Sequence, residues 1–125
     1  TDDFAHDGRY DFYAKSAHQT DAFIKELWDY VQSHEQYRDK TTFIIATDHG
    51  RGTVPLETWK HHGDKIDGAD EVWFAVMGPD TKAEGELKTK GTYYQNQIAK
   101  TVAHLLGLDF EPKKKAGAAM TGLYE

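Results

Sequence analysis

Hydrophobic positions recur with a helical period through the first third of the chain. Between about residue 10 and residue 35, apolar side chains follow one another at spacings of three, four or seven positions: Tyr13, Ala17, Ile24, Leu27, Trp28 and Val31. This spacing predicts one stripe of a helix. A break near residues 16–20 is an alternative, because Thr20 followed by Asp21 can cap a second helical segment. Residues 1–9 show no period, and we expect a loop there.

Two short apolar runs predict strands, at residues 42–47 and 71–77. Neither run alternates with polar residues, so we expect both strands to be buried, with both faces of the first covered. Residues 94–106 predict a second helix, and Gly107 stands at the position of its C-terminal cap. The order of helices and strands indicates an α/β fold with a sheet flanked by helices. Two strands make no stable sheet of this kind. Either further strands lie within residues 53–92, or the rest of the sheet belongs to a missing part of the protein.

Composition narrows the function classes. The 125 residues are enough for one small domain, and 21 acidic against 15 basic residues give a net charge of -6. Such a chain lacks the basic face of a nucleic-acid-binding protein. No apolar run reaches the roughly 18 residues of a membrane span. There is no cysteine, which excludes disulfides and thiolate metal sites and leaves the compartment unknown. The chain starts at Thr1 without a leader pattern, so we expect a fragment or a processed piece.

Five residues carry the candidate chemistry, and their carboxylate and imidazole groups are ligands that zinc and manganese prefer. Asp2 and His6 are four positions apart, so one helical turn or a tight loop would direct both at one point. Asp48 and His49 end the first predicted strand, where α/β folds bind their ligands. The fifth is His62, which Gly63 follows in a long loop. Taken one at a time, each of these residues could equally be a turn cap or a solvated side chain.

Together these residues resemble the C-terminal metal-binding half of the alkaline phosphatase superfamily, over residues 2 to about 108. The resemblance rests on Asp2-x3-His6, on Thr47-Asp48-His49-Gly50 after a strand, and on His62-Gly63. It also rests on a late helix that ends in Leu105-Leu106-Gly107-Leu108. The superfamily includes alkaline phosphatases, phosphodiesterases, cofactor-independent phosphoglycerate mutases and sulfatases. The resemblance implies an alkaline-phosphatase-like α/β sheet flanked by helices and present only in part, so that residues 1–125 form a C-terminal fragment of the domain.

The resemblance also implies roles. Asp2, His6 and His62 would hold one divalent cation, and Asp48 and His49 a second, zinc or manganese, for a phosphate- or sulfate-ester substrate. The family's Thr or Ser nucleophile and a further Asp would lie in the missing N-terminal portion, so no catalytic residue is assigned here. The imidazoles of His6, His49 and His62 suit transition metals better than calcium, which takes oxygen ligands. They therefore favour the two-metal phosphatases, phosphodiesterases and mutases of the superfamily over its calcium-dependent sulfatases.

Several alternatives stay open at this stage. Arg51 is either a contact for phosphate or sulfate or a solvated turn residue. Of the adjacent pair His61 and His62, the following Gly63 favours His62 as the ligand. The alternative to an enzyme part is a non-catalytic binding or structural module that keeps the fold.

Overall fold

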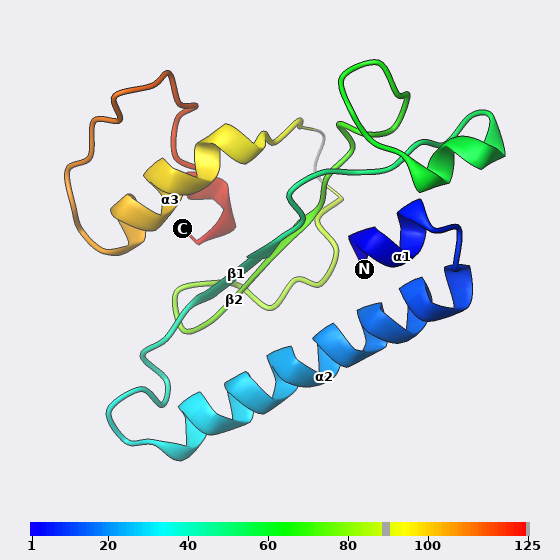
Figure 1. Ribbon diagram of the computed structural model, residues 1–125. Coiled ribbons are helices and arrows are strands. Elements are labelled where there is room, and N and C mark those ends of the chain that lie inside the picture. Colours follow the sequence, from blue (N-terminus) through cyan, green and yellow to red (C-terminus); the bar gives the residue numbers. More distant parts are fainter. Residues whose placement is uncertain (89–90, 125) are drawn as a thin grey trace. The chain divides into compact units, whose positions relative to one another are not determined.

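The computed structural model describes residues 1–88 and 91–124, so positions 89–90 and 125 of the expected 1–125 fragment lie outside the described residues. Its elements form two compact units. The first combines Thr1–Thr41 with Ile45–Ala75, and the second combines Thr42–Ile44 with the chain from Val76 onward. In chain order the elements are α1 (Asp2–His6), α2 (Tyr10–Ser33), β1 (Phe43–Ala46), η1 (Leu56–Lys60), β2 (Phe74–Met77), η2 (Gln95–Gln97), α3 (Ile98–Leu105) and η3 (Thr121–Leu123) (Figure 1).

Two helices begin the first unit. The expected loop at residues 1–9 is wrong in part, because Asp2–His6 form the short helix α1. Five residues are too few to show a period, although two aspartates in the first turn are a helix-start signal. The helix α2 runs unbroken from Tyr10 to Ser33, which excludes the alternative of a break near residues 16–20. The two helices pack together through Phe4 and Phe12, whose ring centroids are 5.5 Å apart.

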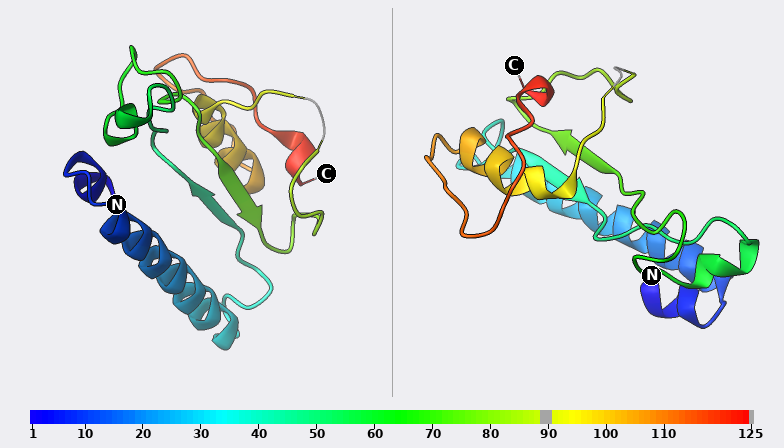
Figure 2. Two further views of the ribbon diagram at one scale, coloured as in Figure 1. Left: turned by 90° about the vertical axis from the view of Figure 1, so that its right-hand side faces the viewer. Right: turned by 90° about the horizontal axis from the view of Figure 1, so that it is seen from above.

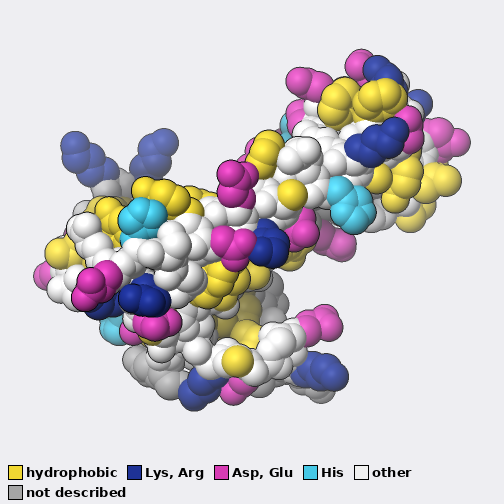
Figure 3. All heavy atoms as spheres, turned by 90° about the horizontal axis from the view of Figure 1, so that it is seen from below, with side chains coloured by type: hydrophobic (Ala, Val, Ile, Leu, Met, Phe, Trp, Pro, Cys, Tyr) yellow, Lys and Arg dark blue, Asp and Glu magenta, His cyan; other side chains and the backbone are white. Residues whose placement is uncertain are grey.

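The apolar stripe of α2 is only partly covered. Only Val31 of this helix is buried, and Leu27 of the stripe is 54% exposed. Two aromatic residues of the helix outside the stripe, Phe23 and Tyr30, are 59% and 55% exposed. Hydrophobic side chains accordingly lie at the surface among charged ones on the face drawn in Figure 3. The spacing therefore predicted the helix correctly but did not predict how much of its stripe would be covered.

The strands β1 and β2 pair in a two-stranded sheet and run antiparallel (Figure 2). The second strand begins at Phe74 rather than at residue 71. Neither strand contains a buried residue, so the expectation of buried strands is wrong. The physical reason is that a two-stranded sheet consists of edge strands and cannot bury both faces by itself. Within residues 53–92, the described positions contain no strand other than β2.

The second unit is organised around α3. The expected cap at Gly107 is confirmed: its φ is 66°, its N–H donates to His104 O, and the N–H of Leu108 donates to Ala103 O. These two bonds form a Schellman motif, which satisfies the last carbonyl groups of the helix. Thr101 is fully buried on α3, and its hydroxyl oxygen accepts a hydrogen bond of 3.0 Å from the N–H of Met120. The chain after α3 is thereby fastened to the helix.

A small α/β arrangement of this kind is compatible with part of the alkaline-phosphatase-like fold that the sequence resembles. Among the described helices, none combines the length and the apolar character that crossing a membrane requires.

Candidate metal centre

Helical geometry brings Asp2 and His6 to one face of α1. Residues four apart in a helix are neighbours on its surface, and Asp2 Oδ2 lies 3.4 Å from His6 Nε2. Of the two conformations that the sequence allowed for this pair, the structure has the helical turn. The carboxylate is 47% exposed and the imidazole 40% exposed, so both side chains are accessible to solvent and to ions.

The turn after β1 depends on Gly50. A Cβ atom at this position would lie 2.3 Å from Gly68 O and 2.4 Å from Glu71 O, closer than atoms can approach. The N–H of Gly50 donates to Ala69 O at 2.8 Å, and the N–H of Gly52 donates to His61 O at 3.1 Å. The residues after β1 are therefore hydrogen-bonded to the segment that carries His61 and His62. Gly63 does not provide the close approach that we expected, because no atom lies within 4 Å of its Cβ position, but its φ of 134° suits glycine.

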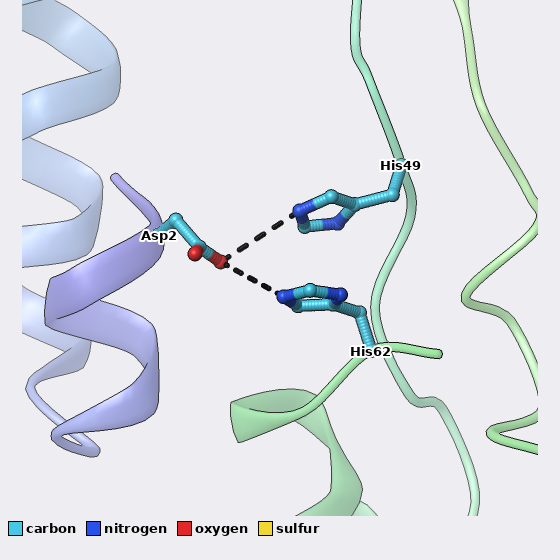
Figure 4. Close-up of side chains that lie close together, drawn as sticks. All are labelled: Asp2, His49 and His62. Carbon is cyan, nitrogen blue, oxygen red and sulfur yellow. Dashed lines mark ion pairs between the residues drawn. The ribbon is translucent and has the colours of Figure 1, made fainter. Parts of the chain in front are cut away.

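Asp2, His49 and His62 form a group whose ligand atoms all lie within 4.8 Å of one another. Figure 4 shows both imidazoles directed at the carboxylate. Asp2 Oδ1 is 3.8 Å from His49 Nε2 and 3.7 Å from His62 Nε2. The two rings stack, with centroids 3.8 Å apart and an interplanar angle of 18°. Residues from α1, from the turn after β1 and from the loop after η1 thus meet at one carboxylate oxygen.

The remaining predicted ligands lie around this group. His6 Nε2 is 3.2 Å from His62 Nε2 as well as 3.4 Å from Asp2, so His6 also faces the cluster. Asp48 Oδ2 lies 3.8 Å from His49 Nε2, and its side chain is 91% exposed. The ring of His61 is farther from the others, with its centroid 6.1 Å from that of His6. Asp48 and His61 are therefore outside the tightest part of the cluster.

The protonation pattern of His49 follows from its hydrogen bond. His49 Nδ1 lies 2.8 Å from Gly50 O. A carbonyl oxygen only accepts hydrogen bonds, so Nδ1 carries the hydrogen in this contact. In the neutral ring, Nε2 then has a free lone pair, and Nε2 is the atom that faces Asp2. A backbone carbonyl that fixes the tautomer in this way is typical of metal-binding histidines.

Arg51 forms an ion pair with Asp2 that the sequence did not reveal. Its side chain is only 14% exposed, and its guanidinium donates to Asp2 Oδ1, to Trp59 O at 3.4 Å and to Asp2 O at 3.5 Å. Burial acts to raise the pKa of the Asp2 carboxyl group. The hydrogen bond and charge of Arg51, followed by His6 and His62, outweigh that effect and hold the pKa below its usual value. The only advance signal was the position of Arg51, directly after Asp48-His49-Gly50.

The family model of sulfatases matches residues 2–108, which is more than half of the chain. The chain belongs to the sulfatase family. The resemblance to the alkaline phosphatase superfamily is thereby confirmed, since the sulfatase family is part of it. Searches among curated proteins and among solved structures found no match.

Membership of the sulfatase family indicates a metal-dependent protein that acts on ester substrates. The donor set of the cluster fits such a metal, because one carboxylate oxygen and two imidazole nitrogens are ligands that zinc accepts. Ligand bonds of about 2.0–2.1 Å in tetrahedral geometry place two donors about 3.4 Å apart. The observed separations of 3.7 Å and 3.8 Å are a few tenths of an ångström longer. Small side-chain rotations would therefore bring Asp2 and either imidazole to the donor separation of a bound cation.

Proposed function

We propose that this chain is the metal-binding part of a two-metal phosphoester or sulfoester hydrolase or phosphotransferase. The observation that supports the proposal is the convergence of Asp2, His49 and His62 in a chain of the sulfatase family. The cluster is reachable from solvent, as a site for an ester substrate must be, because its side chains are 25–47% exposed.

The proposed ligands divide between two divalent cations, zinc or manganese. Asp2, His6 and His62 would hold one, and Asp48 and His49 the other. In two-metal sites the cations are about 3.5–4 Å apart, so the ligands of one lie beside the ligands of the other. The contact between Asp48 and His49 supports this division, and the closeness of His49 to Asp2 and His62 is compatible with two cations that lie side by side.

Cations held by these five residues would supply positive charge to polarise the ester and to neutralise the negative charge that develops during transfer of a phosphoryl or sulfuryl group. The residues of the chain prepare the site for them. Asp2 supplies an ionised carboxylate, because its pKa lies below the usual value of an aspartate. In its neutral form, His49 directs the lone pair of Nε2 toward Asp2, because its Nδ1 donates to Gly50 O. Cation binding needs an ionised carboxylate and a neutral imidazole with a free lone pair, and these contacts favour both.

We further propose that the nucleophile and a further aspartate of the second site belong to an N-terminal portion of the same protein. The basis is the family resemblance, since no Ser or Thr of residues 1–125 has the sequence context of the family's nucleophile. No residue of this chain is therefore assigned as catalytic, and its part is to bind and orient the cations.

The test is a matched pair of proteins, the chain alone and a polypeptide that adds its N-terminal portion. Both are assayed on an aryl phosphate, an aryl phosphodiester and an aryl sulfate, with zinc, with manganese and with a chelator. We expect the chain alone to bind metal but to hydrolyse these esters at the background rate. The longer protein should hydrolyse at least one ester, and the chelator should abolish that activity.

Different failures have different meanings. Full activity in the chain alone would contradict the missing nucleophile. A longer protein that binds zinc but is inert on all three esters would favour the non-catalytic module. Absence of metal from both proteins, measured by elemental analysis after reconstitution, would overturn the proposed metal centre itself.

A further inference from the structure

Arg51 and the two histidines share a single oxygen atom. The guanidinium donates to Asp2 Oδ1, and this same oxygen faces Nε2 of His49 and Nε2 of His62. The second carboxylate oxygen, Oδ2, faces His6 instead. A positively charged group of the protein is therefore in direct contact with the atom around which the candidate ligands converge.

The position of the guanidinium is set by more than this one contact. Its acceptors come from two separate segments: Asp2 provides a carboxylate and a carbonyl oxygen on α1, and Trp59 provides a carbonyl oxygen in η1. The ring of Tyr13 on α2 lies 5.7 Å from the guanidinium carbon. With 14% of its side chain exposed, Arg51 is less accessible than the three clustered ligands. The charge is consequently fixed beside Oδ1 rather than free to move into solvent.

We propose that Arg51 is an internal counter-cation of the metal centre, which neutralises Asp2 and weakens the binding of a divalent cation by charge repulsion. This inference rests on the proposed function, because it concerns the same ligands. An arginine that only orients Asp2 would have the opposite effect, since groups that orient a ligand raise metal affinity by about 10–100-fold. The sign of the change on removing the charge therefore distinguishes the two roles.

The size of the repulsion follows from Coulomb's law. A single and a double positive charge on opposite sides of one carboxylate oxygen lie about 5 Å apart. Even with the full screening of bulk water, their repulsion at that separation lowers affinity by more than about tenfold, and a partly solvated site screens it less. Salt screens such an interaction, because the Debye length falls from about 30 Å at 0.01 M to about 3 Å at 1 M. The structure thus assigns to Arg51 an effect that depends on charge and on ionic strength.

The experiment measures zinc affinity by competition with a chromogenic chelator for the wild-type protein and three variants. Arg51→Met removes the charge, and Arg51→Lys keeps the charge but loses the forked geometry. Arg38→Met changes the net charge equally, but it lies beyond the far end of α2, a helix of 24 residues and so about 36 Å long. We expect zinc binding tighter by at least about tenfold for Arg51→Met at low salt. The other two variants should bind within about twofold of wild type, and the gain of Arg51→Met should shrink at high salt.

Arg51→Met binding zinc as tightly as the wild-type protein, or more weakly, would overturn the inference. Weaker zinc binding by both Arg51→Met and Arg51→Lys would indicate that Arg51 only orients Asp2, and would also overturn it. A second measurement needs no variant: the guanidinium NMR signal of Arg51 should shift when zinc is added to the wild-type protein. An unchanged signal at saturating zinc would also overturn it. Failure of the wild-type protein to bind zinc at all is a different result, because it removes the proposed function together with this inference.

Discussion

Replacing His62 with alanine should weaken zinc binding far more than replacing its neighbour His61. The two residues have the same chemistry and adjacent positions, so the pair is a matched comparison. His62 Nε2 lies 3.7 Å from Asp2 Oδ1 and belongs to the ligand group. The ring of His61 is 6.1 Å from the ring of His6, and His61 is not a member of that group.

The magnitude can be estimated from the ligand count. Structural zinc sites with four ligands bind with about 10–16 kcal/mol, so one ligand contributes on the order of 3 kcal/mol. That corresponds to about a hundredfold in the dissociation constant. We therefore expect a loss of about 30- to 100-fold for His62→Ala and less than about threefold for His61→Ala.

The assay is competition with a chromogenic chelator at neutral pH, with circular dichroism to verify that both variants remain folded. Equal losses in the two variants would refute the choice of His62 as the ligand. No loss in His62→Ala would refute the ligand group itself. A larger loss in His61→Ala would mean that the loop after η1 presents the other imidazole to the metal.

Three further predictions concern stability. Gly50→Ala should lower the free energy of unfolding by about 3 kcal/mol or more, because its Cβ would collide with two carbonyl oxygens, and an unchanged thermal midpoint would contradict the close approach. Thr101→Val keeps the shape but removes the acceptor for the Met120 N–H, so thermal unfolding should reveal a loss of about 1–3 kcal/mol, and a neutral effect would contradict the buried hydrogen bond. The pKa of Asp2 is lower in the folded protein than in the unfolded chain, so its pairing with Arg51 stabilises the folded protein at pH values above the ordinary pKa of an aspartate. This stabilisation is lost as the pH falls through the lowered pKa. Arg51→Met should therefore cost up to about 1 kcal/mol at neutral pH and less in acid, and a cost independent of pH in urea unfolding would argue against the pairing.

The helices were predictable where local rules determine them. The apolar period from Tyr13 to Val31 is a property of the sequence, and α2 covers all of it. Gly107 likewise takes a positive φ that few other residues adopt, so its cap could be read from its residue type. Burial was not predictable in the same way, because it depends on what lies opposite a side chain. Leu27 belongs to the predicted stripe and is nevertheless 54% exposed.

The candidate site was predictable as a set of residue types but not as an arrangement. The sequence indicated Asp2, His6, Asp48, His49 and His62 by their chemistry and their order. It could not show that His49 would stack on His62, because that contact depends on hydrogen bonds between segments distant in the chain. Nor could it show that Arg51 would pair with Asp2 rather than face solvent, because 49 positions separate them. Long-range pairing of this kind has no local sequence signal.

The arrangement of the ligands can be traced to one turn. Glycine is the only residue type that fits at position 50, against Gly68 O and Glu71 O. This close fit allows the N–H of Gly50 to donate to Ala69 O. Its carbonyl oxygen, in the same peptide region, accepts from His49 Nδ1 and so directs Nε2 toward Asp2. Two residues later, the N–H of Gly52 bonds to His61 O and brings the segment of His62 alongside. The Asp-His-Gly sequence thus links backbone geometry to ligand chemistry: the glycine that permits the turn also sets the tautomer of the histidine before it.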